Sequence, residues 1–494
     1  MDDSKLDVPS FFSDKSKLLS FDYSKIQELC DSEIDHAFPI DYLTPIVKKE
    51  ILLEGYFKSI LLGYNHVFIS KVLTDLKNPS ANISLPLLHQ WSGEPRIDNL
   101  VIISDPEDAE KICKRHIQKA PIFKSLLNTS IISTTDNDDW RTQRDAMTNA
   151  FLPKHSLQLV FPASVKRARQ CSELLIRMSD DYTKPVDMSD FFLNETQAQL
   201  QKAMFGFSDE FEQKTNKRIR NAFAGINPEY LLEFSQDALN ETMNSDGPAS
   251  VLFHDSKDIQ KNIGNMILFA FAGHDTTGHT LTWLLYELCK HPEHKQRLIK
   301  EIDEYWLNNS QENYNSFFQL PFMTQCITET LRLWPALANG TYRELEKDEK
   351  IKGHDGSQIT LQKGTYCQII NWTRHRNADL WGPDVNEFNP DREFKDSEIW
   401  HHEGFGGYNV SSDRFSPFTY GPRNCLGKNF SQMEMRLILL NLLRNHDFTL
   451  EEKQAQTVND PKYMGINTFT LGPASVYGGL LGMHVNIHLR KSKL

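Results

Sequence analysis

The segment Phe418–Gly427 reads FTYGPRNCLG and comes immediately before a strongly helical run that reaches about Arg444. Its glycines allow tight turns that approach a bound group closely, and Arg423 places a cation where it can meet a carboxylate. The N-terminus of the following helix directs its dipole and free amides at the Cys425 sulfur, which favours the thiolate over the thiol. Phe418 can shield that sulfur from water. The alternative interpretation is a buried free cysteine in a turn, which is the usual environment of a lone cysteine.

An anionic sulfur is the ligand that pushes electron density onto a haem iron and favours cleavage of an O–O bond. The decapeptide resembles the haem-binding signature of the cytochrome P-450 family, with every signature position filled. The resemblance implies a mainly α-helical fold with a small β subdomain. It also implies haem b, held non-covalently except for the bond between Cys425 and iron. Phe418, Arg423 and Gly427 are then haem-binding residues.

A second part of the resemblance lies in residues 255–292, where the pattern predicts one long apolar helix that is buried in the protein. Its centre, AGHDTT at 272–277, places a glycine, an acid and two hydroxyls where helix propensity and desolvation both disfavour them. Such local violations tend to mark function. The resemblance implies that Asp275 and Thr276 deliver protons to bound oxygen, and that Gly273 leaves room beside the haem. The alternative is a kink with a back-bonded threonine.

Glu329 and Arg332 lie three residues apart in a predicted helix that ends at Pro335, so their side chains share one face. Alone, this pattern is common. Arg392, in the sequence FNPDR, resembles the second arginine of the family's Glu-Arg-Arg triad. We expect these three residues to hold the fold rather than to act in chemistry, because a buried charge that loses its partner is costly.

Trp140 and Arg144 resemble the family helix whose tryptophan and arginine hydrogen-bond a haem propionate. Arg343 is a further candidate for such a contact, with a surface arginine as the alternative. Together with Arg423, this gives three arginines for two carboxylates, for which bidentate pairing is the natural arrangement. Four apolar residues are expected to line the substrate pocket: Phe269, Ala272, Leu337 and Ala338.

Strand and turn patterns predict a small amount of β structure outside the helices. Two strands surround residues 92–95, and Asp105 caps a helix whose first residue is Pro106. Three further β features are predicted farther along the chain: a charged hairpin at 344–350, a strand near 365–371, and a terminal hairpin within 464–489.

The composition limits the possible functions. The chain has 494 residues, 39% of them hydrophobic, and we expect a polar N-terminal extension (1–46) and a single P-450 haem-thiolate domain (47–494). A net charge of −12 disfavours nucleic acid as a partner. Seven cysteines without CxxC spacing indicate neither a disulfide framework nor a zinc site. The polar start shows no signal peptide or membrane span, unlike the anchor helix typical of eukaryotic microsomal members. We therefore expect a cytoplasmic or peripherally membrane-associated protein.

The resemblance implies a monooxygenase that inserts one oxygen atom from O₂ into an apolar organic substrate, a lipid, sterol or xenobiotic. Electrons would come from NAD(P)H through an electron-donor protein, either an NADPH-dependent flavoprotein reductase or a ferredoxin. Two alternatives stay open: an O₂-independent isomerase or dehydratase of the same fold, and a haem-binding protein without turnover. The intact acid–alcohol pair favours the monooxygenase.

Two further expectations follow from the resemblance. Only 272 − 144 = 128 residues separate Arg144 from Ala272, so we expect a short substrate lid. Arg141, Lys428 and Arg436 are expected on the face that meets the electron donor.

Overall fold

The computed structural model describes residues 59, 65–89, 96–127, 129–225, 227–254, 256–401, 410–457, 466–467, 470–473, 475–477 and 481–490. These residues are mainly helical and contain four small sheets, so the predicted fold class is confirmed. None of the described helices is long and apolar enough to cross a membrane. The predicted extension, residues 1–46, lies outside the described residues.

The chain divides into two compact units. Unit 1 comprises Met1–Thr142, Leu337–Glu387 and Ser411–Asn424. Unit 2 comprises Gln143–Ala336, Phe388–Val410 and Cys425–Leu494. Each unit therefore combines segments that are far apart in the sequence, and the single domain over 47–494 stays a prediction.

Unit 1 is built on a four-stranded sheet with the order β1-β2-β7-β4. Its strands are β1 (Ile83–His89), β2 (Arg96–Ile103), β4 (Thr341–Glu344) and β7 (Tyr366–Ile369). β1 and β2 are antiparallel neighbours in the chain, as predicted, whereas β7 runs parallel to β2. A separate pair joins β5 (Glu349–Lys352) to β6 (Gln358–Leu361).

The prediction of a charged hairpin at 344–350 is wrong. Glu344 belongs to β4, which pairs with β7, and Glu349 belongs to β5, which pairs with β6. Glu349 is also buried, next to the guanidinium of Arg115. The dense charge of this stretch indicated a solvated turn, but it did not show that the flanking residues have partners elsewhere in the chain.

The helices of unit 1 are short. They are α4 (Asn65–Asp75), α5 (Pro106–Arg115), α6 (Lys124–Leu127), α16 (Asn371–His375) and α17 (Ala378–Trp381), with a 3₁₀ turn at Pro121–Phe123 and the first residues of α7 (Asn137–Phe151). α5 begins as predicted, because the Asp105 carboxylate accepts the Asp108 amide at 3.0 Å and Pro106 is the first helical residue.

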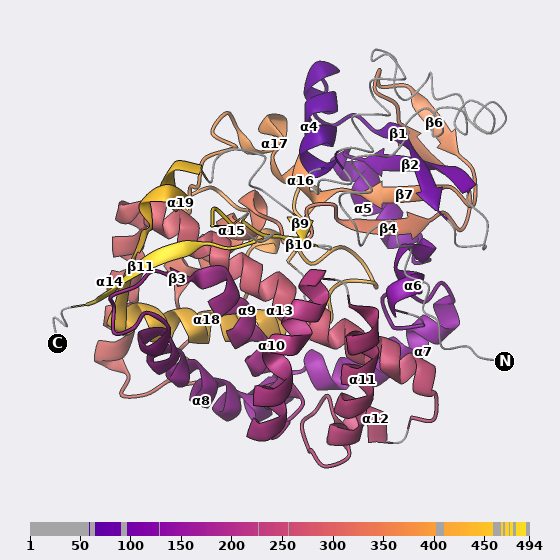
Figure 1. The fold of residues 1–494 in the computed structure, drawn as a ribbon. Helices are drawn as coiled ribbons and strands as arrows, with labels where there is room; N and C mark the ends of the chain where they lie inside the picture. The colour runs from indigo at the N-terminus through magenta and orange to yellow at the C-terminus, as the bar shows by residue number, and fades with distance from the viewer. Residues whose placement is uncertain are drawn as a thin grey trace. The chain divides into compact units, whose positions relative to one another are not determined.

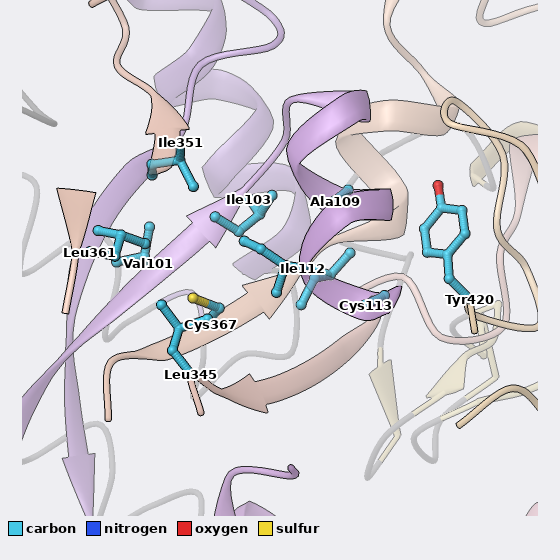
Figure 2. Packing of buried hydrophobic residues seen from close by; sticks show 11 residues of the cluster. Val101, Ile103, Ala109, Ile112, Cys113, Leu345, Ile351, Leu361, Cys367 and Tyr420 are labelled. Atoms are coloured by element: carbon cyan, nitrogen blue, oxygen red, sulfur yellow. The ribbon is translucent and has the colours of Figure 1, made fainter. Parts of the chain in front are cut away.

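The core of unit 1 lies where α5 meets the sheet (Figure 2). Val101 and Ile103 on β2 point to the same face because strand side chains alternate, and Ile112 of α5 packs with them. Tyr420, from the segment that leads to Cys425, belongs to the same cluster, and its hydroxyl donates to the Asp413 carbonyl at 2.8 Å. This burial holds the loop in place up to Asn424.

Unit 2 is mostly helical. It contains most of α7, then α8 (Lys154–Met178), α9 (Met188–Gln199), a π-helical turn (Leu200–Met204), α10 (Asp209–Gly225), α11 (Pro228–Thr242), α12 (Val251–His254), α13 (Ile259–Lys290), α14 (Pro292–Asn308), α15 (Pro321–Leu333), a 3₁₀ turn (Asp396–Glu398), α18 (Lys428–Asn445) and α19 (Glu452–Thr457). Its strands are β3 (Val186–Asp187), β8 (His446–Leu450), β9 (Ile466–Asn467), β10 (Thr470–Leu471) and β11 (His484–Leu489).

α13 is the 32-residue helix that the sequence predicts, and it begins where the Asp258 side chain caps the Lys261 amide at 3.0 Å. It packs against α9, α11, α15 and α18 within unit 2 (Figure 1). Near its end, the Trp283 ring stacks on Trp334 with centroids 3.9 Å apart. The Trp283 indole N–H donates to the Leu471 carbonyl at 3.0 Å, which ties α13 to β10.

The prediction of a terminal hairpin within 464–489 is correct only for its first part. β9 and β10 pair with each other, with Asn467 opposite Thr470. β11 instead pairs with β8 and β3, with Ile487 opposite Phe448. The alternation of residues 484–489 identified a strand, but the pattern of one strand does not specify its partner.

Gly340 provides a test of this packing. Its φ is +70°, and an added Cβ would overlap the Ile369 carbonyl oxygen. We expect Gly340→Ala to lower the unfolding free energy by more than the roughly 1–2 kcal/mol that a left-handed conformation costs a residue with a side chain. Gly364→Ala is the matched control, since Gly364 has a φ of +88° and no atom within 4 Å of the added Cβ. If thermal unfolding shows the same loss of stability in both variants, the overlap with the Ile369 carbonyl oxygen does not destabilise the protein.

Candidate active site

Cys425 lies three residues before the start of α18, in unit 2. Its side chain is exposed to solvent, yet protein atoms surround it closely enough that desolvation raises the pKa of the thiol. The Lys428 ammonium, the Gly427 and Lys428 amides and the Arg144 guanidinium lower that pKa without cancelling the effect of desolvation. The predicted influence of the helix start therefore has the right direction, but in the protein alone the thiol is the favoured form. A bound metal ion supplies the charge that deprotonates a thiol.

The two cations beside Cys425 are desolvated as well. Burial lowers the pKa of Lys428 to about 8, and Cys425 acts in the opposite direction. Burial also lowers the pKa of Arg144, and Cys425 again opposes it. An anionic sulfur at Cys425 would thus stabilise both neighbouring cations, and each cation would stabilise the anion.

Unit 1 contains a cluster of buried cations: Lys119, Arg343 and Arg423 are 7%, 0% and 6% exposed. Among the described residues, no carboxylate forms an ion pair with any of them, and Arg343 Nε and Nη2 and Arg423 Nε have no hydrogen-bond partner. Burial followed by repulsion from Arg343 lowers the pKa of Arg423 to about 9. Burial and the two arginines lower the pKa of Lys119 well below its usual value.

Such a cluster fits an acidic cofactor. Removing unpaired charges from water costs several kcal/mol per ion, so a group with carboxylates is the partner that would offset the cost. Haem b carries two carboxylates, and the unpaired guanidinium N–H groups of Arg343 and Arg423 can donate to them. The predicted residues therefore fit the predicted cofactor. Lys119 was missed, because nothing in its local sequence, IQKAP, distinguishes it from a surface lysine.

Trp140 lies in the same unit, and its ring is 4.5 Å from the centre of the Arg423 guanidinium. Trp140 is 5% exposed. The Arg423 side chain is further fixed by bonds to the Ile131 carbonyl at 3.2 Å and the Thr134 carbonyl at 3.4 Å. This support holds the guanidinium in one position before any anion binds.

In the centre of α13, Asp275 and Thr276 have different environments. The Asp275 carboxylate is buried and accepts the Thr470 hydroxyl of β10, and its other oxygen lies 3.6 Å from His279 Nδ1. Thr276 is half-buried and its hydroxyl donates to the Ala272 carbonyl at 2.9 Å, as in the back-bonded alternative. Sequence reasoning missed His279 and Thr470. Position 279 lies one helical turn after Asp275, which could have identified the histidine, but Thr470 comes from a distant strand.

Two other predicted residues of this part of α13 contact protein side chains. A Cβ at Gly273 would lie 2.7 Å from Leu200 Cδ2, so this glycine accommodates a side chain of the neighbouring π-helical turn. Phe269 is 7% exposed and packs in an aromatic cluster with Phe151 and Phe205, at centroid distances of 5.3 and 6.0 Å. Both residues face protein.

The remaining predicted pocket residues are either half-buried or hydrogen-bonded through the backbone. Ala272 in unit 2 and Leu337 in unit 1 are half-buried. Ala338 is buried, and its carbonyl accepts the amides of Asn371 and Trp372 at 3.2 and 3.0 Å. Phe418 is half-buried in unit 1.

The three residues of the predicted triad come together in unit 2. The Arg332 guanidinium donates to both oxygens of Glu329 at 2.7 and 2.8 Å, and Arg392 Nε donates to Glu329 Oε1 at 3.2 Å. The Asn389 amide donates to the same oxygen at 3.1 Å. Glu329 and Arg332 are completely buried, so α15 and the segment that begins at Phe388 share one buried charge network.

The expected docking face for an electron donor is contradicted at two of its three residues. Lys428 is 1% exposed and Arg436 is completely buried. Arg436 donates to the Thr324 hydroxyl at 2.9 Å and lies over the Trp400 ring. α18 is buried on nearly every side, so a basic residue on this helix need not face water. Only Arg141 is exposed, and it pairs with Asp138.

An accessible cysteine beside desolvated cations is what a haem-thiolate protein requires. Residues 232–473, just under half of the chain, match the model of the cytochrome P450 family, which identifies this stretch as cytochrome P450 sequence. Members of this family bind haem b through a cysteine thiolate bonded to iron. Trp140 and Arg144 lie outside the matched stretch.

Individual relatives agree with this assignment. The chain is 31% identical over 242 residues to cytochrome P450 3A12 of Canis lupus familiaris, covering 48% of this chain and 44% of that protein. It is 34% identical over 212 residues to cytochrome P450 3A29 of Sus scrofa, covering 43% of this chain and 39% of that protein. A putative cytochrome P450 of Caenorhabditis elegans, CYP13A5, is 31% identical over 224 residues, or 45% of this chain and 39% of that protein. The chain thus aligns with less than half the length of these relatives.

The triad generates a stability prediction. Glu329→Ala leaves two buried arginines without their carboxylate, which should lower the unfolding free energy by about 3–5 kcal/mol and reduce haem loading. Asp391→Ala is the control. It removes an exposed pair with Arg297 and should cost about 0–1 kcal/mol. Chemical unfolding and the ratio of haem to protein absorbance measure both effects. A Glu329→Ala protein that is as stable as the control would mean that the network does not hold the fold.

The cation cluster generates a pH prediction for the haem-free protein. Lys119 has a folded-state pKa below its unfolded value of 10.5, so the unfolded state binds more protons between those two values. The wild-type unfolding free energy should therefore rise with pH toward 10.5, and this rise should be smaller in Lys119→Met. Lys347→Met, at an exposed position of the same unit, should keep the wild-type slope. If the unfolding free energy rises equally with pH in all three proteins, Lys119 does not carry a desolvated charge.

Proposed function

We propose that this chain is a haem-thiolate monooxygenase that inserts one oxygen atom from O₂ into an apolar organic substrate. The observation that supports it most is Cys425, an accessible thiol at the start of α18 that two desolvated cations surround, inside the stretch that matches the cytochrome P450 family. Bound haem would supply oxygen activation, which a thiolate ligand favours by pushing electron density onto iron.

Several side chains would hold the cofactor. Cys425 would bind the haem iron through its sulfur, because it is the cysteine of the family signature and is solvent-accessible. The carboxylates of the haem would accept N–H groups of Arg343, Arg423 and Lys119, none of which forms an ion pair with a carboxylate among the described residues. Arg144 would stabilise the anionic sulfur, as its mutual influence with Cys425 indicates.

The chain's own part in proton delivery would come from α13. Of Asp275 and Thr276, only Thr276 is half-buried. Its hydroxyl can donate a hydrogen bond to bound oxygen once it no longer bonds to the Ala272 carbonyl. The Asp275 carboxylate accepts a hydrogen bond from the Thr470 hydroxyl. We propose that Asp275 receives protons and passes them on, while His279 and Thr470 keep its carboxylate in place.

The substrate and the electron donor belong to the same proposal. Ala272 is half-buried beside the acid–alcohol pair and suits an apolar substrate, for which lipids, sterols and xenobiotics are the candidate classes. An NADPH-dependent flavoprotein reductase or a ferredoxin would supply the electrons. Because Lys428 and Arg436 are buried, that partner would have to use other residues of the chain for docking.

Isotope incorporation tests the proposal. The haem-loaded protein is supplied with NADPH, a reductase, ¹⁸O₂ and a panel of lipids, sterols and xenobiotics, and products are analysed by mass spectrometry. A monooxygenase yields product that carries one ¹⁸O atom only when the reductase is present. Rearranged hydroperoxide without reductase or ¹⁸O would identify an isomerase or dehydratase, and haem binding without any product would identify a protein without turnover.

Thr276→Ala tests the proton pathway. Haem content and substrate affinity should stay within about twofold of wild type, while product formed per NADPH consumed should fall severalfold because proton delivery is lost. Thr280→Ala is the matched control. Its hydroxyl makes the same type of bond, to the Thr276 carbonyl at 2.8 Å, one helical turn later. A ratio that falls equally in both variants would assign the effect to helix geometry rather than to the Thr276 hydroxyl.

A further inference from the structure

Three side chains at the junction of α13 and α14 bring metal-binding atoms together outside the proposed active site. They are His291, Glu293 and His294, and their ligand atoms all lie within 4.8 Å of one another. His291 Nδ1 is 3.6 Å from Glu293 Oε1, and His294 Nε2 is 4.0 Å from the same oxygen. Ligand atoms around a tetrahedral zinc ion with bonds of about 2.0–2.2 Å lie roughly 3.3–3.6 Å apart. A small rotation of the exposed Glu293 side chain would reach that spacing.

A buried carboxylate already supports one of these histidines. Glu287 Oε2 lies 3.5 Å from His291 Nε2, and Glu287 is 5% exposed. Its other oxygen accepts the Trp334 indole N–H at 2.6 Å, which fixes the carboxylate. Metal-bound histidines almost always donate their second ring N–H to such a group, because this sets the tautomer and the ring orientation. The arrangement leaves Nδ1 of His291 facing Glu293 and His294.

The rings themselves are held in place. Phe388 packs against both, with centroid distances of 5.8 Å to His291 and 6.0 Å to His294. His294 also contacts Phe322 at 6.3 Å. Two histidines whose rings are already oriented lose little side-chain freedom when an ion binds.

The local charges also favour a cation. Glu287 lies 3.5 Å from one ring nitrogen of His291 and Glu293 lies 3.6 Å from the other, so two carboxylates face this position. Arg297 is the nearby cation on α14, and Asp391 neutralises it through an ion pair.

We propose that His291, Glu293 and His294 form a binding site for a divalent transition-metal ion of the zinc class, with a fourth position open to water. Two imidazoles and one carboxylate are the ligands that suit Zn²⁺, and Cu²⁺ and Ni²⁺ also bind such sets. The ion would stabilise the junction of α13 and α14 against Phe388. The next residue, Asn389, donates its amide to Glu329, so the ion would also steady the end of that buried network.

Zinc titration of the full-length, haem-loaded protein tests the site. Zn²⁺ is titrated against a chromophoric zinc chelator, with wild type, His294→Ala and the His291→Ala/His294→Ala double variant compared. The wild type should bind one more equivalent than the double variant, and the single variant should bind that equivalent at least tenfold more weakly. His401→Ala, which alters an exposed histidine near Asp396, is the control and should match the wild type. Equal stoichiometry in wild type and double variant would overturn the proposal.

Two further variants separate metal binding from folding. Glu293 is exposed, so Glu293→Ala should leave the metal-free unfolding midpoint unchanged while it removes the rise in midpoint that Zn²⁺ produces in wild type. Glu287→Gln keeps all three ligands and should weaken zinc binding by roughly 10–100-fold, the range that a supporting carboxylate contributes. A zinc-induced rise of the same size in Glu293→Ala and wild type would also overturn the proposal.

Discussion

Buried positive charge is the constraint on which the rest of this structure depends. In unit 2, the Glu329 carboxylate neutralises Arg332 and Arg392, and every one of these side chains is almost fully removed from water. In unit 1, Lys119, Arg343 and Arg423 are buried to a similar degree without a carboxylate partner among the described residues. A chain that pairs its buried arginines so completely in one place leaves them unpaired in another only if another anion joins them. Under the proposed function, the carboxylates of a haem would be that anion.

The need of a buried charge for a partner also explains the centre of α13. A carboxylate in the middle of a buried helix is costly, and Asp275 is accommodated because Thr470 and His279 face it. This network joins the acid to a strand almost two hundred residues away, so the position of β10 determines where the acid points. Thr276, in contrast, is satisfied within its own helix and is the member of the pair that can change partner. The two residues are therefore suited to different parts of one proton pathway.

Features that depend on neighbouring residues could be predicted from the sequence. The Asp105 cap, the β1–β2 hairpin and the span of α13 are all determined by patterns within a few turns of chain. The cofactor candidates came from motifs, and their spacing did not indicate that Arg343 and Arg423 would be buried.

Features that depend on distant partners could not be predicted. β11 alternates as a strand should, yet its partners β8 and β3 are specified by packing in three dimensions. The burial of two basic residues could not be predicted from their charge, because Arg436 lies on a helix that is enclosed on nearly every side and Lys119 has no local motif. Gly273 has Leu200 as a neighbour, and no pattern in α13 could have revealed this contact.

The most direct measurement of the central claim is the spectrum of the ferrous carbonyl complex in wild type, Cys425→Ala and Cys289→Ala. Burial raises the pKa of both thiols, to about 12 for Cys289, but Cys425 is the exposed one and belongs to the family signature, so it is the candidate iron ligand. Wild type and Cys289→Ala should show the thiolate-type band, and Cys425→Ala should lack it. A thiolate-type band that persists in Cys425→Ala would contradict the assignment of Cys425 as the haem ligand.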